Sequence, residues 1–271
     1  MNPISLEKWL ESFTHPLVIA GPCSAENEAQ ILNIAHQVKQ IPQVKMFRAG
    51  IWKPRTRPGS FEGVGDIGLP WLKKVKEETG LLVTTEVANA RHVEAALKND
   101  IDVLWIGART SANPFSVQEI AQALRGTGIP VMVKNPINAD LSLWIGALER
   151  FAAIGLNKLA AIHRGFSTGE KSDYRNPPRW KIPIELKRRF PNLPIVCDPS
   201  HISGKRSLIK KVCQKAMDVD MSGLMVETHY DPTIALSDAA QQVTPDSLKD
   251  IVENLVLRTS HSENRLSLIH I

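Results

Sequence analysis

The sequence contains few cysteines and few aromatic side chains, and these shortages exclude several kinds of protein. Its 271 residues include only three cysteines, Cys23, Cys197 and Cys213, at unrelated spacings. Such an odd, scattered set rules out a disulfide-stapled fold and favours a reducing, cytoplasmic location. Two tyrosines and seven phenylalanines are too few for an aromatic platform on which nucleic-acid bases stack. A nucleic-acid partner is therefore not expected.

Long apolar runs are missing as well. No segment approaches the roughly 20 apolar residues needed to cross a bilayer. The first residues, MNPISLEKWLESF, include two glutamates and lack the basic-then-apolar order of a signal peptide. We therefore expect neither a membrane span nor a membrane partner.

Positive charge is in modest excess. Lysine and arginine number 33 against 28 aspartates and glutamates, which gives a net charge of +5. That balance suits an anionic partner, but the basic residues are spread along the chain and form no arm or tail. A small phosphorylated substrate is the expected partner.

Short apolar runs alternate with longer segments of helical period. Each run is bounded by glycine, proline or polar residues and is short enough for a buried strand. The predicted strands cover residues 16–23, 44–50, 81–87, 101–108, 130–136, 158–165, 194–201 and 223–230. The amphipathic segments predict helices over residues 26–40, 69–80, 91–100, 116–126, 142–155, 181–190, 207–218 and 245–258.

Eight strands that alternate with eight helices predict an α/β fold, a single (β/α)₈ TIM barrel, with a doubly wound open sheet as the lesser alternative. We expect the catalytic barrel to span residues 16–258. Residues 1–15 would form a short N-terminal extension, as an added helix or a cap, and residues 259–271 a C-terminal tail.

A barrel of this kind places its chemistry at the carboxyl ends of the strands. Three potential metal ligands, Cys23, His201 and Glu227, end predicted strands one, seven and eight, and Asp238 follows in the last loop. A thiolate, an imidazole and two carboxylates suit a divalent ion such as Mn, Fe, Co or Zn. Taken singly, Cys23 could be an inert buried thiol, His201 a loop histidine and Asp238 a helix N-cap. Their convergence on one barrel mouth favours the metal site.

Six cations also sit at or just past strand ends: Arg48, Lys53, Arg55, Arg109, Lys134 and Arg164. Buried, unpaired charges are costly, so cations that meet at one rim imply anions between them. The alternative is a ring of structural salt bridges with Glu86, Asp198 and Glu227. Those carboxylates are too few to neutralise six cations once a metal takes Glu227, and two phosphate-sized groups and a carboxylate fit the charge count better.

These residues lie in segments that resemble a known enzyme family. GPCSAE, FRAGIWKPRT, VTTEV, IGART, VKNP, HRGF, DPSHISGKR and VETHYDPTIALSD are similar to motifs of the 3-deoxy-D-arabino-heptulosonate 7-phosphate (DAHP) synthases, type I beta subfamily, also called phospho-2-dehydro-3-deoxyheptonate aldolases. The resemblance runs in order through nearly the whole chain. It implies the same TIM barrel and a metal-dependent transferase that condenses phosphoenolpyruvate with erythrose 4-phosphate and releases phosphate, the first step of the shikimate pathway to aromatic amino acids.

Related 3-deoxy-D-manno-octulosonate 8-phosphate synthases, which use arabinose 5-phosphate, are the alternative. They typically read KANRTS where this chain has Lys53-Pro54-Arg55-Thr56, and DATH where it has Asp198-Pro199-Ser200-His201. Both differences favour the heptulosonate enzyme. His163 stands where the family often has glutamate before Arg-Gly. A metal-dependent barrel hydrolase is a more remote alternative, because it leaves the six cations unexplained.

The resemblance implies a role for each site residue. Cys23, His201, Glu227 and Asp238 would hold the metal. Phosphoenolpyruvate would contact Arg48, Lys53, Arg109, Lys134 and Arg164, with Asp198 also in the substrate site, and the aldose phosphate would contact Arg55 and Thr56. Lys53, Glu86 and His201 would be the catalytic residues. A homo-oligomer, dimer or tetramer, is expected, and residues 259–271 are either a tail or the stub of a further module such as a chorismate mutase.

Overall fold

In the computed structural model, eight parallel strands form a closed barrel in the order β1 to β8. The description covers residues 1–10, 13–53, 59–169 and 171–257. The strands are β1 (Leu17–Gly21), β2 (Val44–Arg48), β3 (Leu82–Val87), β4 (Val103–Ile106), β5 (Val131–Lys134), β6 (Leu159–His163), β7 (Ile195–Cys197) and β8 (Gly223–Glu227). Because β1 pairs with β8, the predicted TIM barrel is confirmed and the open sheet is excluded.

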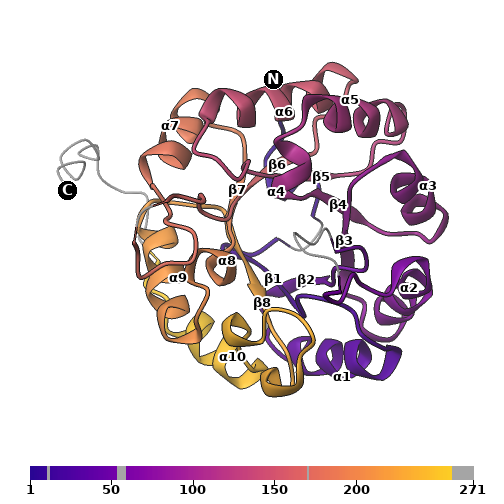
Figure 1. Ribbon diagram of the computed structural model, residues 1–271, viewed down its shortest axis with the longest axis vertical. Helices are drawn as coiled ribbons and strands as arrows, with labels where there is room; N and C mark the ends of the chain where they lie inside the picture. The colour runs from indigo at the N-terminus through magenta and orange to yellow at the C-terminus, as the bar shows by residue number, and fades with distance from the viewer. Residues whose placement is uncertain (11–12, 54–58, 170, 258–271) are drawn as a thin grey trace.

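Helices surround the barrel as an outer ring (Figure 1). They are α1 (Glu28–Val38), α2 (Gly68–Thr79), α3 (Ala90–Lys98), α5 (Pro114–Ala123), α6 (Leu141–Ala153), α7 (Lys181–Arg189), α9 (Ile209–Asp218) and α10 (Pro245–Glu253). Several begin where the sequence offers a capping side chain, since Asn27, Asn89 and Asp140 each accept a hydrogen bond from a first-turn N–H. Their apolar faces and the outward faces of the strands share one large hydrophobic core.

Two short helices at the carboxyl ends of strands were not predicted. α4 (Ala108–Ser111) follows β4 after the single residue Gly107, and α8 (Pro199–Ser203) follows β7 after the single residue Asp198. The predicted strand 194–201 was therefore too long. It stops at Cys197 because the Asp198 side chain caps α8 and Pro199 occupies its first turn, a combination that starts helices. The predicted helix 245–258 was also too long, since α10 ends at Glu253.

Side chains inside the barrel alternate with those that face the helices. The interior holds apolar residues, among them Met46, Met132, Val196 and Met225. Two positions further along the chain from each of these residues stands a charged one, at the end of the strand or just past it: Arg48, Lys134, Asp198 and Glu227. The alternation that directs apolar side chains into the barrel therefore also directs four charged side chains into its carboxyl-terminal mouth.

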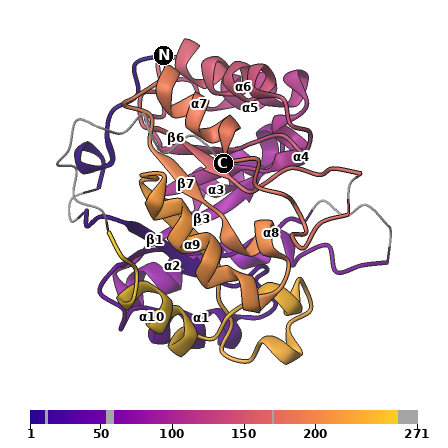
Figure 2. The same cartoon turned by 90° about the vertical axis from the view of Figure 1, so that its left-hand side faces the viewer.

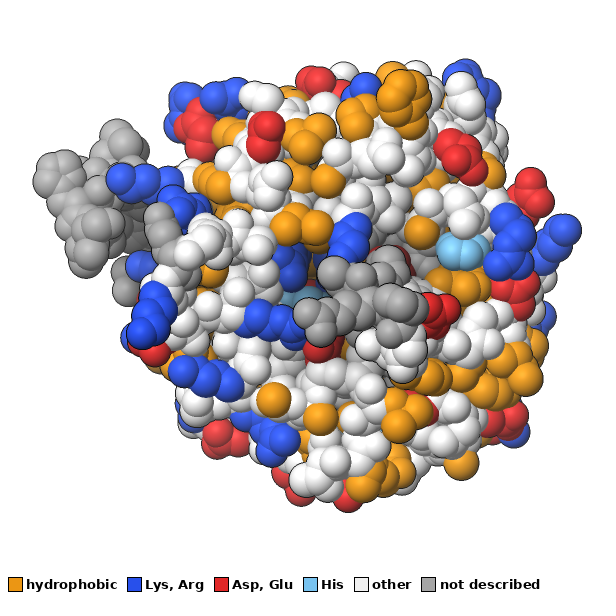
Figure 3. Space-filling view, viewed as in Figure 1, with side chains coloured by type: hydrophobic (Ala, Val, Ile, Leu, Met, Phe, Trp, Pro, Cys, Tyr) orange, Lys and Arg blue, Asp and Glu red, His pale blue; other side chains and the backbone are white. Residues whose placement is uncertain are grey.

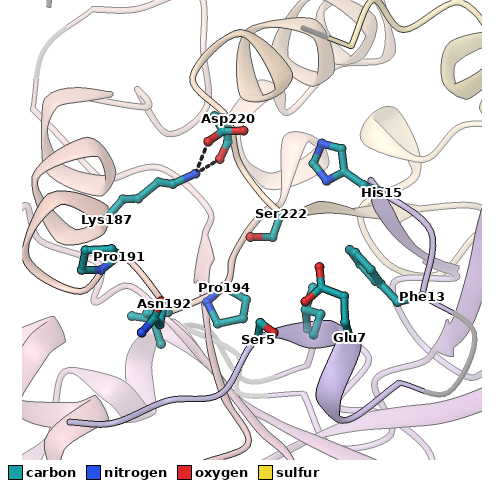
Figure 4. Close-up of a pocket in the computed structure, with 12 residues that line it drawn as sticks. Ser5, Glu7, Phe13, His15, Lys187, Pro191, Asn192, Pro194, Asp220 and Ser222 are labelled. Carbon is teal, nitrogen blue, oxygen red and sulfur yellow. Dashed lines mark hydrogen bonds and ion pairs between the residues drawn. The ribbon is translucent and has the colours of Figure 1, made fainter. Parts of the chain in front are cut away.

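The amino-terminal segment closes the other end of the barrel. Leu6, in the 3-10 turn η1 (Leu6–Lys8), and Leu10 are buried in the interior cluster. Figure 2 shows this segment at the opposite end of the barrel from α8. A cavity of about 220 Å³ lies beside it, where Glu7 and His15 face the Lys187–Asp220 ion pair of 2.7 Å (Figure 4). In the described part of the chain, no helix is long and apolar enough to cross a bilayer.

Candidate active site

The carboxyl-terminal mouth of the barrel brings together three of the four predicted metal ligands. One ligand atom each from Cys23, Glu227 and Asp238 lies within 4.8 Å of the others. Cys23 follows β1, Glu227 ends β8, and Asp238 directly precedes the 3-10 turn η5 (Ala239–Gln241). Strand pairing explains the meeting of the first two, because β1 and β8 are neighbours that align Gly21 with Glu227.

The Cys23 thiol is buried among polar partners. Its Sγ lies 3.1 Å from Ser237 Oγ and 3.4 Å from Asp238 Oδ2, and it accepts a hydrogen bond of 3.1 Å from Lys53 Nζ. Burial, with a contribution from Glu227, raises the pKa of Cys23 to about 11, although the Lys53 ammonium opposes that shift. Metals bind the thiolate form. A divalent cation between the thiol and the two carboxylates would supply the positive charge that favours this form.

Glu227 is fully buried and only partly satisfied. Its Oε2 accepts a hydrogen bond of 2.7 Å from Gln241, while its Oε1 has no hydrogen-bond donor among the described residues and lies 3.4 Å from Arg48 Nη2. Burial alone would raise the pKa of Glu227, but His201 and Arg48 outweigh burial and lower it. An ionised, open oxygen beside Cys23 and Asp238 fits a metal ligand.

His201 lies at the edge of this group. Its backbone N–H donates to Asp198 Oδ1 at 3.0 Å, which fixes the first turn of α8. Its Nδ1 lies 2.8 Å from Asp198 Oδ2 and 3.7 Å from Glu227 Oε1. A carboxylate that accepts a hydrogen bond from Nδ1 is the usual means of orienting a metal-binding imidazole, which then binds through Nε2. The 2.8 Å contact is an ion pair without hydrogen-bond geometry, since Nδ1 has no hydrogen-bond partner among the described residues. The structure therefore places His201 next to the three-ligand group without including it.

Asp238 does not cap a helix. Its backbone is in the left-handed region, with φ of +50°, and its side chain makes no capping hydrogen bond to the described residues. Instead, Oδ1 accepts a hydrogen bond of 2.8 Å from Arg175 Nη1. Burial would raise the pKa of Asp238, but His201 and Arg175 outweigh burial and hold it below its usual range.

Two of the predicted cations lie over the ring of Trp105, which forms the floor of the mouth. Arg48 is buried with its guanidinium 5.0 Å from the centre of that ring, and Lys134 Nζ lies 5.9 Å from it. Both cations have acidic neighbours, since Arg48 pairs with Glu227 at 3.4 Å and Lys134 with Asp198 at 2.9 Å. The salt-bridge alternative is thus partly realised. Arg48 Nη1, however, is buried without a hydrogen-bond partner in the described part of the chain, so the mouth still has a donor for an anion.

Lys53 is held at the edge of the same space. Its Nζ donates to the Cys23 carbonyl at 3.0 Å as well as to the thiol. Burial alone would lower the pKa of Lys53, but Cys23, Glu227 and Glu86 outweigh burial and raise it. Lys53 is therefore an ammonium that can give a proton to an oxyanion formed beside it.

Arg164 and Arg109 approach each other at the mouth. Arg164 donates from Nη1 to Asn176 Oδ1 at 2.8 Å, and its backbone N–H donates to Asn135 Oδ1 at 2.8 Å. Burial lowers the pKa of Arg164 to about 10, and the nearby Arg175 and Arg109 contribute to the shift. Because the group stays charged at neutral pH, these converging cations suit an anion. Arg55 and Thr56 lie outside the described residues.

Glu86 completes the predicted set. Its carboxylate accepts a hydrogen bond of 2.9 Å from Trp105 Nε1. Gly107 makes room for it, since a Cβ on Gly107 would lie 2.1 Å from Glu86 Oε1. Figure 3 shows the resulting mouth, in which Lys and Arg side chains gather around a central hollow with acidic groups beside them.

His163 is excluded from the mouth by strand alternation. It follows the interior residue Ile162 and therefore faces the helices, where its ring lies 5.3 Å from Trp180 and 5.8 Å from Phe166. The side chain is fully buried, and burial, with the charge of Arg164, lowers its pKa to about 3. Its role is packing behind the loop that carries Arg164.

Sequence reasoning missed several polar residues that support the site. Arg175 and Asn176 lie in the loop between β6 and α7, Gln241 lies in η5, and Trp105 lies in β4. Position was the available signal, because the first three follow strand ends at the functional side of the barrel. The pairing of these particular side chains with the ligands depends on loop conformations that have no signature in the sequence.

Residues 12–262 match the DAHP synthetase I family. The chain belongs to this family. It is 32% identical to the phospho-2-dehydro-3-deoxyheptonate aldolase of Thermotoga maritima over 88% of this chain and 68% of that protein. The crystal structure of that aldolase superposes with a TM-score of 0.79 at 31% identity and covers 87% of this chain and 67% of that one. The predicted resemblance is confirmed.

Several 2-dehydro-3-deoxyphosphooctonate aldolases are also similar to this DAHP synthetase I family member. The 2-dehydro-3-deoxyphosphooctonate aldolase of Syntrophotalea carbinolica is 28% identical over 89% of this chain and 90% of that protein. The corresponding enzyme of Geobacter metallireducens is 29% identical over 89% of this chain and 92% of its own length. Family membership thus establishes an enzyme of the aldolase and synthase class.

Proposed function

We propose that this enzyme condenses phosphoenolpyruvate with erythrose 4-phosphate to give DAHP and inorganic phosphate, with a divalent metal ion as cofactor. The observation that supports it is the meeting of Cys23, Glu227 and Asp238 within 4.8 Å beside buried Arg48 and Lys134. A metal site next to a cation pocket suits one polarised aldehyde and one phosphorylated carboxylate.

Cys23, Glu227 and Asp238 would hold the metal, with His201 turned to it through Nε2. The bound ion would act as a Lewis acid on the aldehyde oxygen of the sugar phosphate. Mn, Co, Fe and Zn all accept this mixture of sulfur, nitrogen and oxygen donors. Asp198 would orient the His201 ring, as its 2.8 Å approach to Nδ1 allows.

The cations would fix phosphoenolpyruvate above Trp105. Arg48, Lys53 and Lys134 would bind its carboxylate end, and Arg109, Arg164 and Lys134 its phosphate. Arg55 and Thr56 would bind the phosphate of the aldose. Two anions held head to tail would supply the orientation that a bimolecular carbon–carbon bond requires.

The chemistry then needs one acid and one base from the chain. Carbon 3 of phosphoenolpyruvate would form a bond to the aldehyde carbon, and the aldehyde oxygen would take a proton from the Lys53 ammonium. Carbon 2, now cationic, would be captured by water, with Glu86 taking a proton from that water. The hydroxyl on carbon 2 would then give its proton to the departing phosphate as the bond between carbon 2 and the phosphate oxygen breaks, which releases phosphate and leaves the ketone of the product. Proton transfer from Glu86 to Lys53 through solvent would restore both groups.

Condensation with arabinose 5-phosphate is the second candidate, because octulosonate aldolases match almost the whole chain. Phosphate release from phosphoenolpyruvate separates the candidates when it is measured with erythrose 4-phosphate, with arabinose 5-phosphate and with neither. We expect release only with the four-carbon sugar. Preference for the five-carbon sugar would support the octulosonate enzyme, and release without any aldose would support a hydrolase.

A further inference from the structure

Arg175 reaches from the loop between β6 and α7 into the loop that carries Asp238. Its Nη1 donates two hydrogen bonds of 2.8 Å, one to Asp238 Oδ1 and one to Gln241 Oε1. Half of the Arg175 side chain is exposed, so charge attraction alone would contribute little here. One acceptor, however, directly precedes η5 and the other is its last residue, so one nitrogen fixes their separation across the turn.

Gln241 carries the connection to a second ligand. The side chain is buried, and its Nε2 donates a hydrogen bond of 2.7 Å to Glu227 Oε2. The amide is thereby oriented at both ends, since its oxygen accepts from Arg175 and its nitrogen donates to Glu227. One continuous network joins Arg175 to both carboxylates of the three-ligand group.

The network decides which oxygen of each carboxylate is available. Asp238 Oδ1 is bound to Arg175, and Oδ2 is the oxygen that lies 3.4 Å from the Cys23 sulfur. Glu227 Oε2 is bound to Gln241, and Oε1 has no hydrogen-bond donor among the described residues. In each ligand one oxygen is anchored, which leaves the other toward the common centre.

The Arg175 stem is itself held in place by α8. A Cβ on Gly204, the residue that ends α8, would lie 2.4 Å from Arg175 Cβ, so only glycine lets the stem cross there. The neighbouring Asn176 donates from Nδ2 to the His201 carbonyl at 2.7 Å. The loop at Arg175 and Asn176 therefore contacts the segments of two predicted metal ligands, Asp238 and His201, and reaches a third, Glu227, through Gln241.

We propose that Arg175 and Gln241 are positioning residues that orient the Asp238 and Glu227 carboxylates for metal binding. This rests on the metal site of the proposed function. Orienting partners of metal ligands commonly change metal affinity about 10- to 100-fold when they are removed. By charge alone, loss of the Arg175 cation would strengthen the binding of a dication, so weaker binding after its removal identifies orientation as the cause.

Cobalt(II) titration of the metal-free full chain tests the proposal. The absorption band that arises from thiolate coordination to cobalt reports binding at Cys23, and no substrate is needed. The variants are Arg175→Met, which keeps the aliphatic stem against Gly204, and Gln241→Met, which keeps the length and loses both hydrogen bonds. Lys205→Met is the matched control, because Lys205 is a half-exposed cation that pairs at 3.9 Å with Asp173 and not with a ligand.

We expect both network variants to bind cobalt about 10- to 100-fold more weakly, and the control to bind as tightly as the wild type or more tightly. Because the two residues act through one network, the double variant should lose less than the product of the two single losses. Unchanged affinity in Gln241→Met and Arg175→Met, with circular dichroism showing folded metal-free proteins, would overturn the proposal. Absence of the band in the wild type would instead contradict the metal site itself. If Arg175→Met fails to fold, Gln241→Met alone decides.

Discussion

The indole N–H of Trp105 donates a hydrogen bond of 2.9 Å to the Glu86 carboxylate, so a residue of the barrel interior fixes an acid at the mouth. The same indole ring lies beneath the Arg48 guanidinium at 5.0 Å. Trp105 therefore sets the positions of an anion and a cation at once. Both are residues to which the proposed reaction assigns a role.

Gly107→Ala tests the placement of Glu86. The new methyl group would fall 2.1 Å from Glu86 Oε1, so the carboxylate must move away. A misplacement of about 1 Å can cost about 100-fold in rate. We therefore expect kcat to fall by about that factor, with little change in the melting temperature. Gly146→Ala is the control, because a Cβ there meets only Arg150 Nη1 at 3.6 Å within helix α6. Equal activity of the two variants would contradict a role for Glu86.

His163 should make the fold sensitive to acid. Its pKa is lowered to about 3 by burial, whereas the unfolded chain binds a proton at this residue near pH 6.5. The pKa of His163 is lower in the folded than in the unfolded chain, so its contribution to the free energy of unfolding is complete above about pH 6.5. That contribution is lost as pH falls toward 3, and the free energy of unfolding then drops by at most about 1.4 kcal/mol per pH unit. Urea unfolding at about pH 7.5 and pH 5 should show a smaller drop in His163→Leu than in the wild type. Equal drops would show that His163 is not held neutral.

The position of His163 illustrates what the sequence could and could not predict. The alternation of apolar runs and amphipathic segments predicts the barrel, because each strand and each helix has its own period. The motif residues at strand ends predict which side chains meet at the mouth. The sequence, however, left the role of His163 open, and only the strand register shows that its side chain faces the helices.

The polar residues that hydrogen-bond to the predicted metal ligands were harder to predict. Arg175 and Asp238 are 63 residues apart in sequence, and their 2.8 Å contact depends on the conformation of two loops. Similarly, α8 begins inside a segment whose composition favoured a strand, because one capping aspartate and one proline override the apolar pattern. Loop contacts of this kind have no period that a sequence can display.

Chelation should abolish activity, and Mn²⁺ should restore it. The prediction follows from the meeting of Cys23, Glu227 and Asp238, which brings one thiol and two carboxylates within 4.8 Å of one another. Cys23→Ser should weaken binding most for thiophilic ions, because a hydroxyl replaces the soft thiolate donor. Metal content and phosphate release are the measurements. Full turnover by a protein shown to be metal-free would contradict the cofactor assignment.

Arg55→Ala should weaken the binding of the aldose phosphate more than the binding of phosphoenolpyruvate. Arginine presents a bidentate fork to a phosphate, which neither alanine nor lysine reproduces. We expect the KM for erythrose 4-phosphate to rise about tenfold or more, as befits a charged hydrogen bond of roughly 1.5–3 kcal/mol, with a much smaller change for phosphoenolpyruvate. An equal rise for both substrates would move Arg55 out of the aldose site.

The metal site is tested most directly by an anomalous difference map at the manganese edge, from crystals grown with Mn²⁺ and phosphoenolpyruvate. We predict one strong peak in the mouth, within bonding distance of Cys23 Sγ, Glu227 and Asp238 and facing His201 Nε2, with the substrate phosphate against Lys134 and Arg164. A mouth that holds substrate but no manganese, or a peak bound to other residues, would contradict the assignment.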